Sequence, residues 1–360
     1  MANLNISICG MNLINPVMPA AGPTVRDAAC ILACAKGGAG GLVTKTISVK
    51  GAEVPRPCME EIQGGFLNTE LWSELSPEHW VKHEYAFLKE AGLPVMISLG
   101  YTAEEIETLV PLVTPFADTL EISTHYVGKD LQPIINSLKA AKKSGLPVFM
   151  KISPGIPDVA AYVKRMEQEG ADGFVAINSV GPCLHIDIET GLPFMGSTSG
   201  YGWLSGKAIK PIALRHVYEI SSAVSVPVIG VGGISKGEDA IEMLMAGASA
   251  VQVCTEAILK GPQVYGRIAS EIDNWLKEHD IADVKDIIGL TIKKMKDRTC
   301  KVTPLFPIVN ENRCISCNMC VQSCAYQAIT LEPKAVINKN KCFGCGLCIT
   351  RCSKKAISII

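Results

Sequence analysis

Short apolar runs alternate with amphipathic segments from residue 14 to about residue 280. Many of the runs are rich in Val, Ile or Leu on both faces, as expected of strands buried in a parallel sheet. They are residues 16–20, 41–47, 94–99, 119–123, 147–152, 173–178, 227–231 and 250–254. The amphipathic segments predict helices near residues 27–36, 78–90, 103–116, 130–143, 158–168, 207–222, 237–246 and 263–278. Together these β–α units predict a (β/α)8 TIM barrel.

A doubly wound open sheet is the alternative arrangement of alternating strands and helices. In its dinucleotide-binding form, the motif G-x-G-x-x-G follows the first strand. The predicted first strand here runs instead into Ala20-Ala21-Gly22-Pro23, so the motif is absent. We therefore predict a barrel for residues 1–280.

The pattern changes in residues 310–360, which contain eight cysteines in two runs of identical spacing. Each run reads Cys-x2-Cys-x2-Cys-x3-Cys. This spacing is typical of a bacterial two-cluster ferredoxin, in which the fourth cysteine of each run ligates the other cluster. One predicted 4Fe-4S cluster therefore uses Cys314, Cys317, Cys320 and Cys352. The second uses Cys342, Cys345, Cys348 and Cys324.

Zinc ribbons and structural disulfides are the alternatives for these cysteines. Tetrahedral zinc takes four ligands from well-separated knuckles, which two tight four-cysteine runs suit poorly. Disulfides are not expected, because residues 1–10 lack the basic segment and apolar core of a secretory signal. We interpret residues 281–309, which include Pro304 and Pro307, as a linker between the two predicted domains.

Composition and charge mainly exclude certain classes of partner and a membrane-spanning segment. The 360 residues carry a formal charge of −1, which gives no reason to expect nucleic acid or a membrane surface as a partner. No apolar run reaches the roughly 18 residues of a membrane span. We expect a cytoplasmic protein.

The predicted strand ends carry the candidate chemistry, because a barrel places its active site at the carboxyl ends of its strands. Lys45, Lys151 and Asn178 lie at or near the carboxyl ends of three of the predicted strands. Gly232-Gly233 and Thr255 follow the seventh and eighth, which is the usual phosphate site of this fold. These residues predict a phosphorylated, electron-accepting ligand. FMN fits, because it exchanges a two-electron hydride for the single electrons that clusters carry.

Several stretches resemble known flavoproteins. Residues 15–22 (NPVMPAAG), residues 43–46 (VTKT) and Asn68 resemble class 1 dihydroorotate dehydrogenases. Residues 204–215, 231–240 and 246–254 resemble the flavin barrel of dihydropyrimidine dehydrogenase, which also precedes a two-cluster ferredoxin region.

The resemblance implies a set of binding residues. Lys45 would lie near the flavin ring as a catalytic residue, because its ammonium would stabilise negative charge on the reduced ring. Asn68, Ser123, Ser179 and the 180–203 loop would face substrate. The residues implied to hold FMN, with Gly206 and the last four around its phosphate, are Ala20, Ala21, Lys45, Lys151, Asn178, Ser205, Gly206, Gly232, Gly233, Cys254 and Thr255.

The end of the fourth predicted strand departs from the family. Where the family has Asn-x-Ser-Cys-Pro, with the cysteine moving a proton, this chain reads Glu121-Ile122-Ser123-Thr124-His125. Imidazole is the commonest general acid–base group, so we expect His125, directly or through Thr124, to deliver the proton. We expect Glu121 to select a substrate bearing an N–H or ammonium group. The alternative is that His125 caps the loop and that Glu121 pairs with Lys45 or Lys151.

The predicted function is an FMN- and iron–sulfur-dependent oxidoreductase acting on an activated C=C or C=N bond of a small nitrogen-containing substrate. Dihydropyrimidine or dihydroorotate dehydrogenase activity is the alternative. An electron-transfer subunit is the alternative of another class. The sequence has no second nucleotide-binding motif, so we expect a ferredoxin or an NAD(P)H-dependent flavoprotein subunit to supply electrons. We also expect a homo-oligomer.

Overall fold

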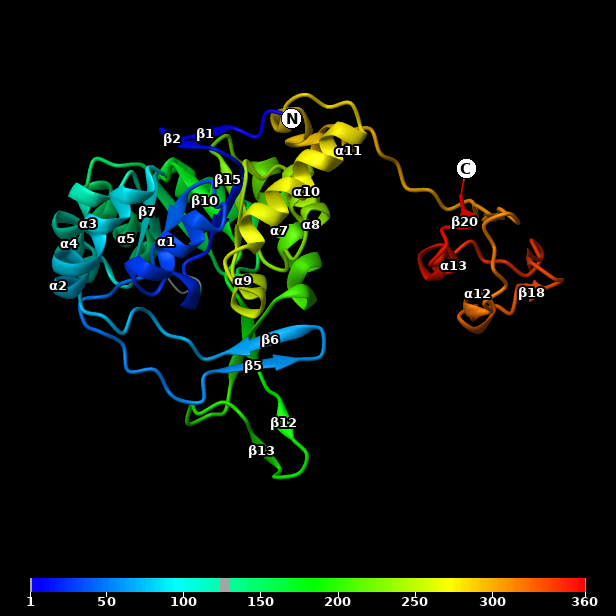
Figure 1. Ribbon diagram of the computed structural model, residues 1–360, viewed down its shortest axis with the longest axis horizontal. Coiled ribbons are helices and arrows are strands. Elements are labelled where there is room, and N and C mark those ends of the chain that lie inside the picture. The colour runs from blue at the N-terminus through cyan, green and yellow to red at the C-terminus, as the bar shows by residue number, and fades with distance from the viewer. Residues whose placement is uncertain (1, 124–127, 129, 360) are drawn as a thin grey trace. The chain divides into compact units, whose positions relative to one another are not determined.

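The computed structural model describes residues 2–123, 128 and 130–359 (Figure 1). Contacts divide the chain into two compact units, Met1–Lys296 and Asp297–Ile360. Each unit is described by itself below.

The first unit is built around an eight-stranded parallel sheet that is nearly closed into a barrel. Its hydrogen-bonded order is β3-β16-β15-β10-β9-β8-β7-β4. The two end strands are joined through Gly40, whose N–H donates to the carbonyl of Val17 at 2.7 Å. The strands are β3 Val17–Pro19, β4 Leu42–Val43, β7 Val95–Leu99, β8 Thr119–Ile122, β9 Val148–Ile152, β10 Gly173–Ala176, β15 Val228–Val231 and β16 Ala250–Val253. The TIM-barrel prediction is confirmed.

Helices follow these strands, and all but the short one at residues 255–260 lie in the predicted places. They are α1 Ala28–Lys36, α4 Ala103–Val113, α5 Gln132–Lys142, α6 Val159–Gln168, α7 Lys210–Ala223, α8 Gly237–Met245, α9 Thr255–Lys260 and α10 Val264–Glu278. Short 3-10 turns are η1 Pro23–Val25, η4 Thr114–Phe116 and η5 Lys207–Ile209. The helix predicted near 78–90 is a composite of α2 Pro77–His79, the π-helical η2 Trp80–Glu84, α3 Tyr85–Leu88 and the 3-10 turn η3 Lys89–Ala91.

The alternation pattern did not predict a second, antiparallel sheet of order β11-β14-β6-β5. Its strands are β5 Met59–Ile62, β6 Gly65–Asn68, β11 Val180–Cys183 and β14 Gly202–Ser205. The hairpin of β12 Ile186–Asp187 and β13 Leu192–Pro193 extends from the same side of the barrel (Figure 1). Trp203 is in register with Asn68, and Ser205 with Phe66. This pairing brings two segments far apart in the sequence to the same edge of the barrel.

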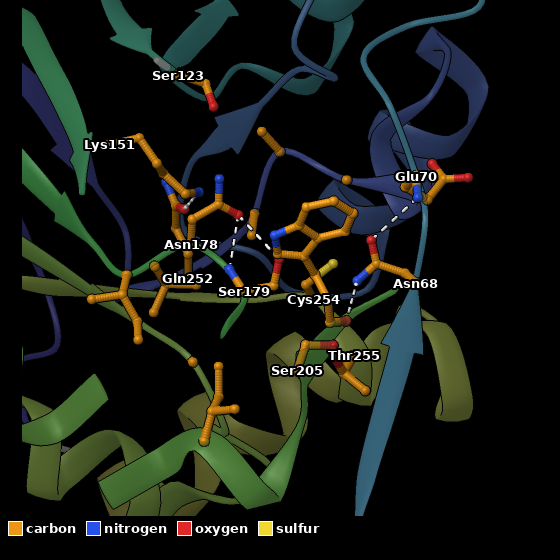
Figure 2. Close-up of a pocket in the computed structure, with 18 of the residues that line it drawn as sticks. Asn68, Glu70, Ser123, Lys151, Asn178, Ser179, Ser205, Gln252, Cys254 and Thr255 are labelled. Carbon is orange, nitrogen blue, oxygen red and sulfur yellow. Dashed lines mark hydrogen bonds between the residues drawn. The ribbon is translucent and has the colours of Figure 1, made fainter. Parts of the chain in front are cut away.

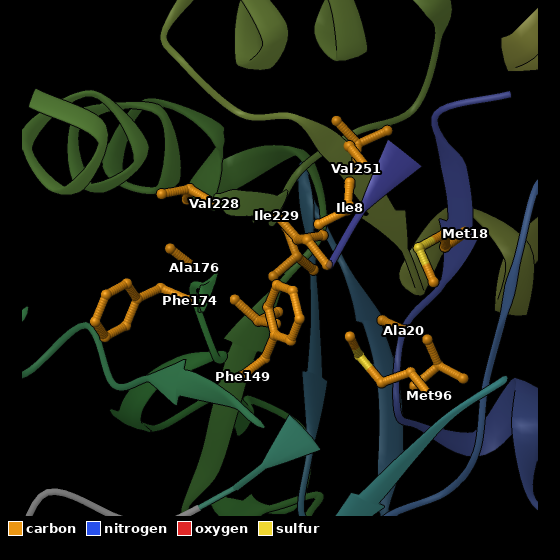
Figure 3. Close-up of a cluster of buried hydrophobic side chains, with 14 of the residues drawn as sticks. Ile8, Met18, Ala20, Met96, Phe149, Phe174, Ala176, Val228, Ile229 and Val251 are labelled. Carbon is orange, nitrogen blue, oxygen red and sulfur yellow. The ribbon is translucent and has the colours of Figure 1, made fainter. Parts of the chain in front are cut away.

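Large apolar side chains fill the core of the barrel unit. Figure 3 shows Met18, Met96, Phe149 and Ile229 among them, each with no exposed surface. Truncating a buried aromatic residue such as Phe149 to Ala costs about 3–5 kcal/mol of stability. This packing gives the strand ends a rigid base.

The barrel unit extends past the predicted boundary at residue 280. η6 Val284–Ile287 and α11 Leu290–Met295 belong to it, and Val284 and Ile287 lie in its core. At the start of the chain, β1 Ile6–Ile8 and β2 Met11–Leu13 form a hairpin. The first part of the predicted linker therefore packs as barrel structure.

The second unit contains two short antiparallel pairs and two helices. β17 Ile308–Val309 pairs with β20 Ile357–Ser358, and β18 Ile329–Leu331 pairs with β19 Ala335–Ile337. The helices are α12 Met319–Gln322 and α13 Leu347–Arg351. In the described part of the chain, no helix combines the length and apolar character needed to cross a bilayer.

Candidate functional site

The carboxyl ends of the barrel strands border a cavity of about 250 Å³. Residues from both the parallel sheet and the β6–β14 pair line it (Figure 2). All the residues predicted to hold FMN line this one cavity: Ala20, Ala21, Lys45, Lys151, Asn178, Ser205, Gly206, Gly232, Gly233, Cys254 and Thr255. Asn68, Glu121, Ser123 and Ser179 line it as well. The structure therefore brings the predicted site residues within its described part together.

Glu121 lines this cavity and has no exposed surface. Its Oε1 accepts hydrogen bonds from Ser98 Oγ at 3.2 Å and from Lys151 Nζ at 3.5 Å. Its Oε2 accepts from Gln252 Nε2 at 3.1 Å. Lys151 Nζ also donates to Gln252 Oε1 at 3.4 Å. Both carboxylate oxygens are therefore engaged, and the Glu121–Lys151 pair considered as the alternative is present.

Lys45 is the second buried cation at the cavity, and it pairs with Glu70. Its Nζ donates to Glu70 Oε2, and the two side chains are 8% and 16% exposed. Glu70 Oε1 lies 3.5 Å from the thiol of Cys58, which donates to it. Burial, together with the Glu70 carboxylate, raises the pKa of Cys58, so the thiol remains protonated as a donor.

Asn68 positions the segment that carries Glu70. Its Nδ2 donates to the carbonyl of Trp203 at 3.1 Å, and its Oδ1 accepts from the Glu70 N–H at 3.3 Å. Figure 2 shows Asn68 and Glu70 on one side of the cavity, with Lys151 and Asn178 on the other. The β6–β14 pairing thus fixes the position of Glu70 relative to the barrel strands.

A group of glycines lies at another edge of the cavity. Gly206, Gly232 and Gly233 have φ values of +78°, +124° and +76°, a region that favours glycine. A Cβ at Gly233 would lie 2.6 Å from Lys210 Cβ, so no larger residue fits there. Beside them, Ser205 Oγ and Thr255 Oγ1 are 2.9 Å apart. Consecutive backbone N–H groups in such turns form concavities that bind anions.

The remaining polar groups face the cavity from strand ends. Asn178 Oδ1 accepts the N–H of Ser179 at 2.8 Å. Burial raises the pKa of the Cys254 thiol, while Lys151 and Lys45 partly oppose that shift, so the thiol stays neutral at pH 7. Ser123 is 8% exposed. Thr124 and His125, the predicted proton carriers, lie outside the described residues.

Sequence reasoning did not single out several other lining residues, among them the polar or aromatic Glu70, Trp72 and Gln252. Gln252 had a usable signal, since it is a polar residue in the middle of an otherwise apolar predicted strand. Glu70 and Trp72 lie in a segment without a strand or helix pattern. Only the long-range β6–β14 pairing and the loop after β6 bring them to the cavity.

The cysteines of the second unit surround two small cavities of about 20 Å³ each. Cys314, Cys317, Cys320 and Cys352 line one of them. Cys324, Cys342, Cys345 and Cys348 line the other. These are the two crossed sets that the spacing predicts. All fifteen cysteines of the chain are free in this structure, so the disulfide alternative is not realised.

The two crossing cysteines have matching surroundings. Cys324 Sγ accepts the N–H of Ala328 at 3.3 Å, and Cys352 Sγ accepts the N–H of Ala356 at 3.2 Å. Backbone N–H groups of Ala335 and Ser316 lower the pKa of Cys314. Such hydrogen bonds favour the thiolate form, which is the form that ligates iron.

Comparisons with known proteins find a matching family model in each of the two units. Residues 3–276 match the family model "Dihydroorotate dehydrogenase", and residues 313–356 match "4Fe-4S dicluster domain". Three similar proteins are each named dihydroorotate dehydrogenase B (NAD(+)), catalytic subunit. The protein of Methanosarcina mazei is 38% identical over 304 residues, which cover 80% of this chain and 95% of that protein.

The protein of Pyrococcus abyssi is 34% identical over 305 residues, which cover 81% of this chain and 99% of that protein. The protein of Methanothermobacter thermautotrophicus is 32% identical over 300 residues, with 80% and 98% covered. These relatives are thus covered almost entirely, while about a fifth of this chain lies outside each alignment. The chain belongs to the dihydroorotate dehydrogenase family of oxidoreductases, and it carries a 4Fe-4S dicluster domain in addition.

Proposed function

We propose that this protein is an FMN- and iron–sulfur-dependent oxidoreductase that reduces or forms an activated C=C or C=N bond in a small nitrogen-containing substrate. The observation that carries the proposal is the convergence of the predicted FMN residues on one cavity, in a chain with two four-cysteine cavities. An oxidoreductase with both kinds of site couples hydride chemistry to single-electron transfer.

The cavity suits FMN in the chemistry of its donors. The turns at Gly206, Gly232 and Gly233 offer a concavity for a phosphate, and the hydroxyls of Ser205 and Thr255 lie beside it. Lys45, Lys151 and Asn178 would hold the ring from the strand ends. When bound, FMN would exchange a hydride with a substrate carbon and single electrons with the clusters.

The side chains around the cavity have separate roles in this proposal. The ammonium of Lys45 would stabilise negative charge on the reduced flavin ring. The ammonium of Lys151 is held in place by Glu121 and Gln252. Glu121 positions Lys151 through that contact. Its carboxylate also accepts hydrogen bonds from Ser98 and Gln252. The proton at the atom next to the reacting carbon is assigned to His125, with Thr124 as a relay.

Electrons enter through the cysteine-rich unit, from a partner protein. We assign two 4Fe-4S clusters to the crossed cysteine sets, because each set lines a cavity of its own. A ferredoxin or an NAD(P)H-dependent flavoprotein subunit would be the donor. Dihydroorotate or dihydropyrimidine dehydrogenase activity is the second candidate, and the family match supports the first of these two activities.

The test is a direct one. Denaturation of the purified protein should release FMN and no FAD, since the glycine turns end the site at a phosphate. The reduced protein is then mixed anaerobically with candidate substrates while flavin absorbance is followed. A compound that reoxidises the flavin identifies the substrate. Release of FAD, or a protein that never binds flavin, would refute the proposal. A flavin that only a protein partner reoxidises would make the chain an electron-transfer subunit.

A further inference from the structure

The two cysteine cavities of the second unit differ in charge, and this inference rests on the two clusters proposed above. The first set is Cys314, Cys317, Cys320 and Cys352, and the second set is Cys324, Cys342, Cys345 and Cys348. Lys354 is the one charged residue among the described residues that line the cavity of the first set with its cysteines. No described Lys, Arg, Asp or Glu lines the cavity of the second set. The two sites therefore share their ligand type but not their electrostatic surroundings.

A second lysine, Lys334, is tied to the first set by hydrogen bonds. It lies in the turn of the β18–β19 hairpin, where its carbonyl accepts the N–H of Glu332 at 2.8 Å. Its Nζ donates to the carbonyl of Cys314 at 2.8 Å, and Ser316 Oγ donates to the carbonyl of Pro333 at 2.7 Å. Lys334 is half-buried, and no carboxylate among the described residues pairs with its ammonium. A fixed positive charge therefore lies beside the backbone of a first-set ligand.

The matching place in the second cysteine run is uncharged. Gly344 stands there where Ser316 stands in the first run, two residues after the leading cysteine. A Cβ at Gly344 would lie 3.2 Å from the carbonyl oxygen of Leu305, so a backbone segment packs against this position. The second cavity is also lined by the stacked rings of Tyr326 and Phe343, whose centroids are 4.8 Å apart. Backbone and apolar groups thus surround the second set where a lysine approaches the first.

Two other influences on a cluster are similar at the two sites. The reduction potential of an iron–sulfur cluster depends on nearby charge, on hydrogen bonds to its sulfurs and on solvent exposure. The crossing cysteines, Cys324 and Cys352, each accept one backbone N–H, at 3.3 and 3.2 Å. Each set also has one exposed cysteine, Cys317 or Cys345. The lysine charge is therefore the main difference between the two sites.

We propose that Lys334 raises the reduction potential of the first-set cluster above that of the second, so that the two clusters take up electrons in a fixed order. Reduction adds one electron to a group that its thiolate ligands already make negative. An adjacent ammonium stabilises this added charge, whereas an apolar lining does not. Each cluster takes up one electron, and the first electron that the partner donor delivers resides on the first set.

A redox titration of the full-length protein tests this order. The anaerobically purified chain is titrated with dithionite, and electron paramagnetic resonance gives a midpoint potential for each cluster. The two midpoints should differ by at least about tenfold in the one-electron reduction equilibrium, which is about 59 mV. Cys348→Ser, expected to retain only the first-set cluster, should show the higher of the two midpoints. Equal midpoints in the parent protein, or the lower midpoint in Cys348→Ser, would overturn the proposal.

Lys334→Met removes the charge and keeps an unbranched side chain. It should lower the higher midpoint by at least about tenfold in the same equilibrium and leave the lower midpoint in place, because one nearby charge is lost. Lys334→Arg keeps the charge and should stay within about threefold of the parent protein. Lys301→Met is the matched control, since Lys301 is an exposed lysine of the same unit that lines neither cavity.

A higher midpoint that stays unchanged in Lys334→Met, or an equal fall of both midpoints, would overturn the proposal. Iron and acid-labile sulfide are measured in every sample. Iron far below about eight atoms per chain in the parent protein would refute the proposed clusters and this inference with them. Full iron content with equal midpoints would refute this inference alone.

Discussion

The two compact units differ in what holds them together. The barrel unit has an extensive apolar core that includes Met18, Phe149 and Ile229. The core of the second unit consists of Cys320, Ile329, Ala335 and Ile357, and one of these is itself a predicted cluster ligand. Domains this small rarely bury enough apolar surface alone, and metal binding often supplies their folding free energy. We therefore expect the barrel to shape its site before a cofactor binds, and the second unit to depend on the proposed clusters for its folding.

The units also differ in charge. Residues 1–296 contain 25 Lys and Arg against 32 Asp and Glu, whereas residues 297–360 contain 9 against 3. The near-zero charge of the whole chain hides this asymmetry. Surface charge governs encounter rates between proteins more than it governs folding. The basic unit is thus suited to meet an acidic electron donor.

Removing one cluster ligand should produce the largest effect, and the effect should be confined to the second unit. Cys348→Ser should reduce the iron content from about eight to about four atoms per chain, because each crossed set is proposed to hold one 4Fe-4S cluster. FMN per chain should stay unchanged, since the barrel core does not involve Cys348. Iron, acid-labile sulfide and FMN are measured after anaerobic purification.

Cys300→Ser is the control for this experiment, because Cys300 is exposed and lies outside both runs. It should retain all iron. Zinc in place of iron in the parent protein would end the cluster assignment. Loss of FMN together with iron would contradict the independence of the barrel site.

His125→Gln should have the next largest effect, this time confined to the barrel chemistry. We expect the rate of flavin reoxidation by substrate to fall about a hundredfold or more, the usual scale of general acid catalysis. Substrate binding, FMN and iron should all persist. Stopped-flow absorbance measures the rate, and His83→Gln, a histidine that does not line the cavity, is the control. Near-normal turnover in His125→Gln would remove the proton role from this residue.

Electron entry should depend on the charge of the second unit. Reduction by an acidic protein donor should slow about tenfold between low and high salt, because screening weakens electrostatic steering. Lys354→Glu with Lys355→Glu, both exposed, should slow it similarly at low salt. Lys260→Glu on the barrel unit is the matched control.

NADH alone should reduce the chain slowly, because a partner protein is expected to supply the electrons. Rapid reduction of the isolated chain by NADH would overturn this requirement for a partner.

The smallest effect concerns barrel stability and its pH dependence. Burial opposes ionisation of Asp239, but hydrogen bonds from Lys210 and Ser235 outweigh it and lower the pKa of this carboxyl below 3.8. A lowered pKa means that the stabilisation is present above the unfolded-state pKa and is lost as pH falls through the folded-state value. Asp239→Asn should therefore cost about 1–3 kcal/mol at pH 7.

Urea unfolding at a series of pH values measures this difference. The parent and the variant should converge as pH falls below about 4, where the Asp239 carboxylate begins to protonate. Asp280→Asn, at an exposed position after α10, should match the parent throughout. A difference between parent and Asp239→Asn that persists at low pH would show that the contribution is packing and not charge.

Several features of the protein could be predicted from sequence alone because they depend on local pattern. Buried strands read as apolar runs, so all eight barrel strands were found, although each is shorter than its run. The crossed cysteine sets follow from spacing within a few residues. Lys45, Lys151 and Asn178 were found because each lies at or near the carboxyl end of a predicted strand, and parallel strands all end at one rim.

Other features were decided only by the tertiary structure. The β6–β14 sheet pairs residues 65–68 with residues 202–205. The sequence of neither segment predicts which distant segment it will pair with. Glu70 could not be assigned to Lys45 from the sequence, since the pairing depends on that sheet and on the loop after β6. The sequence left open whether Glu121 meets substrate or an ammonium, and only the tertiary structure shows its buried contacts with Lys151 and Gln252. Periodicity and spacing report which local structures form, whereas the energy of a buried charge depends on every group that folding brings around it.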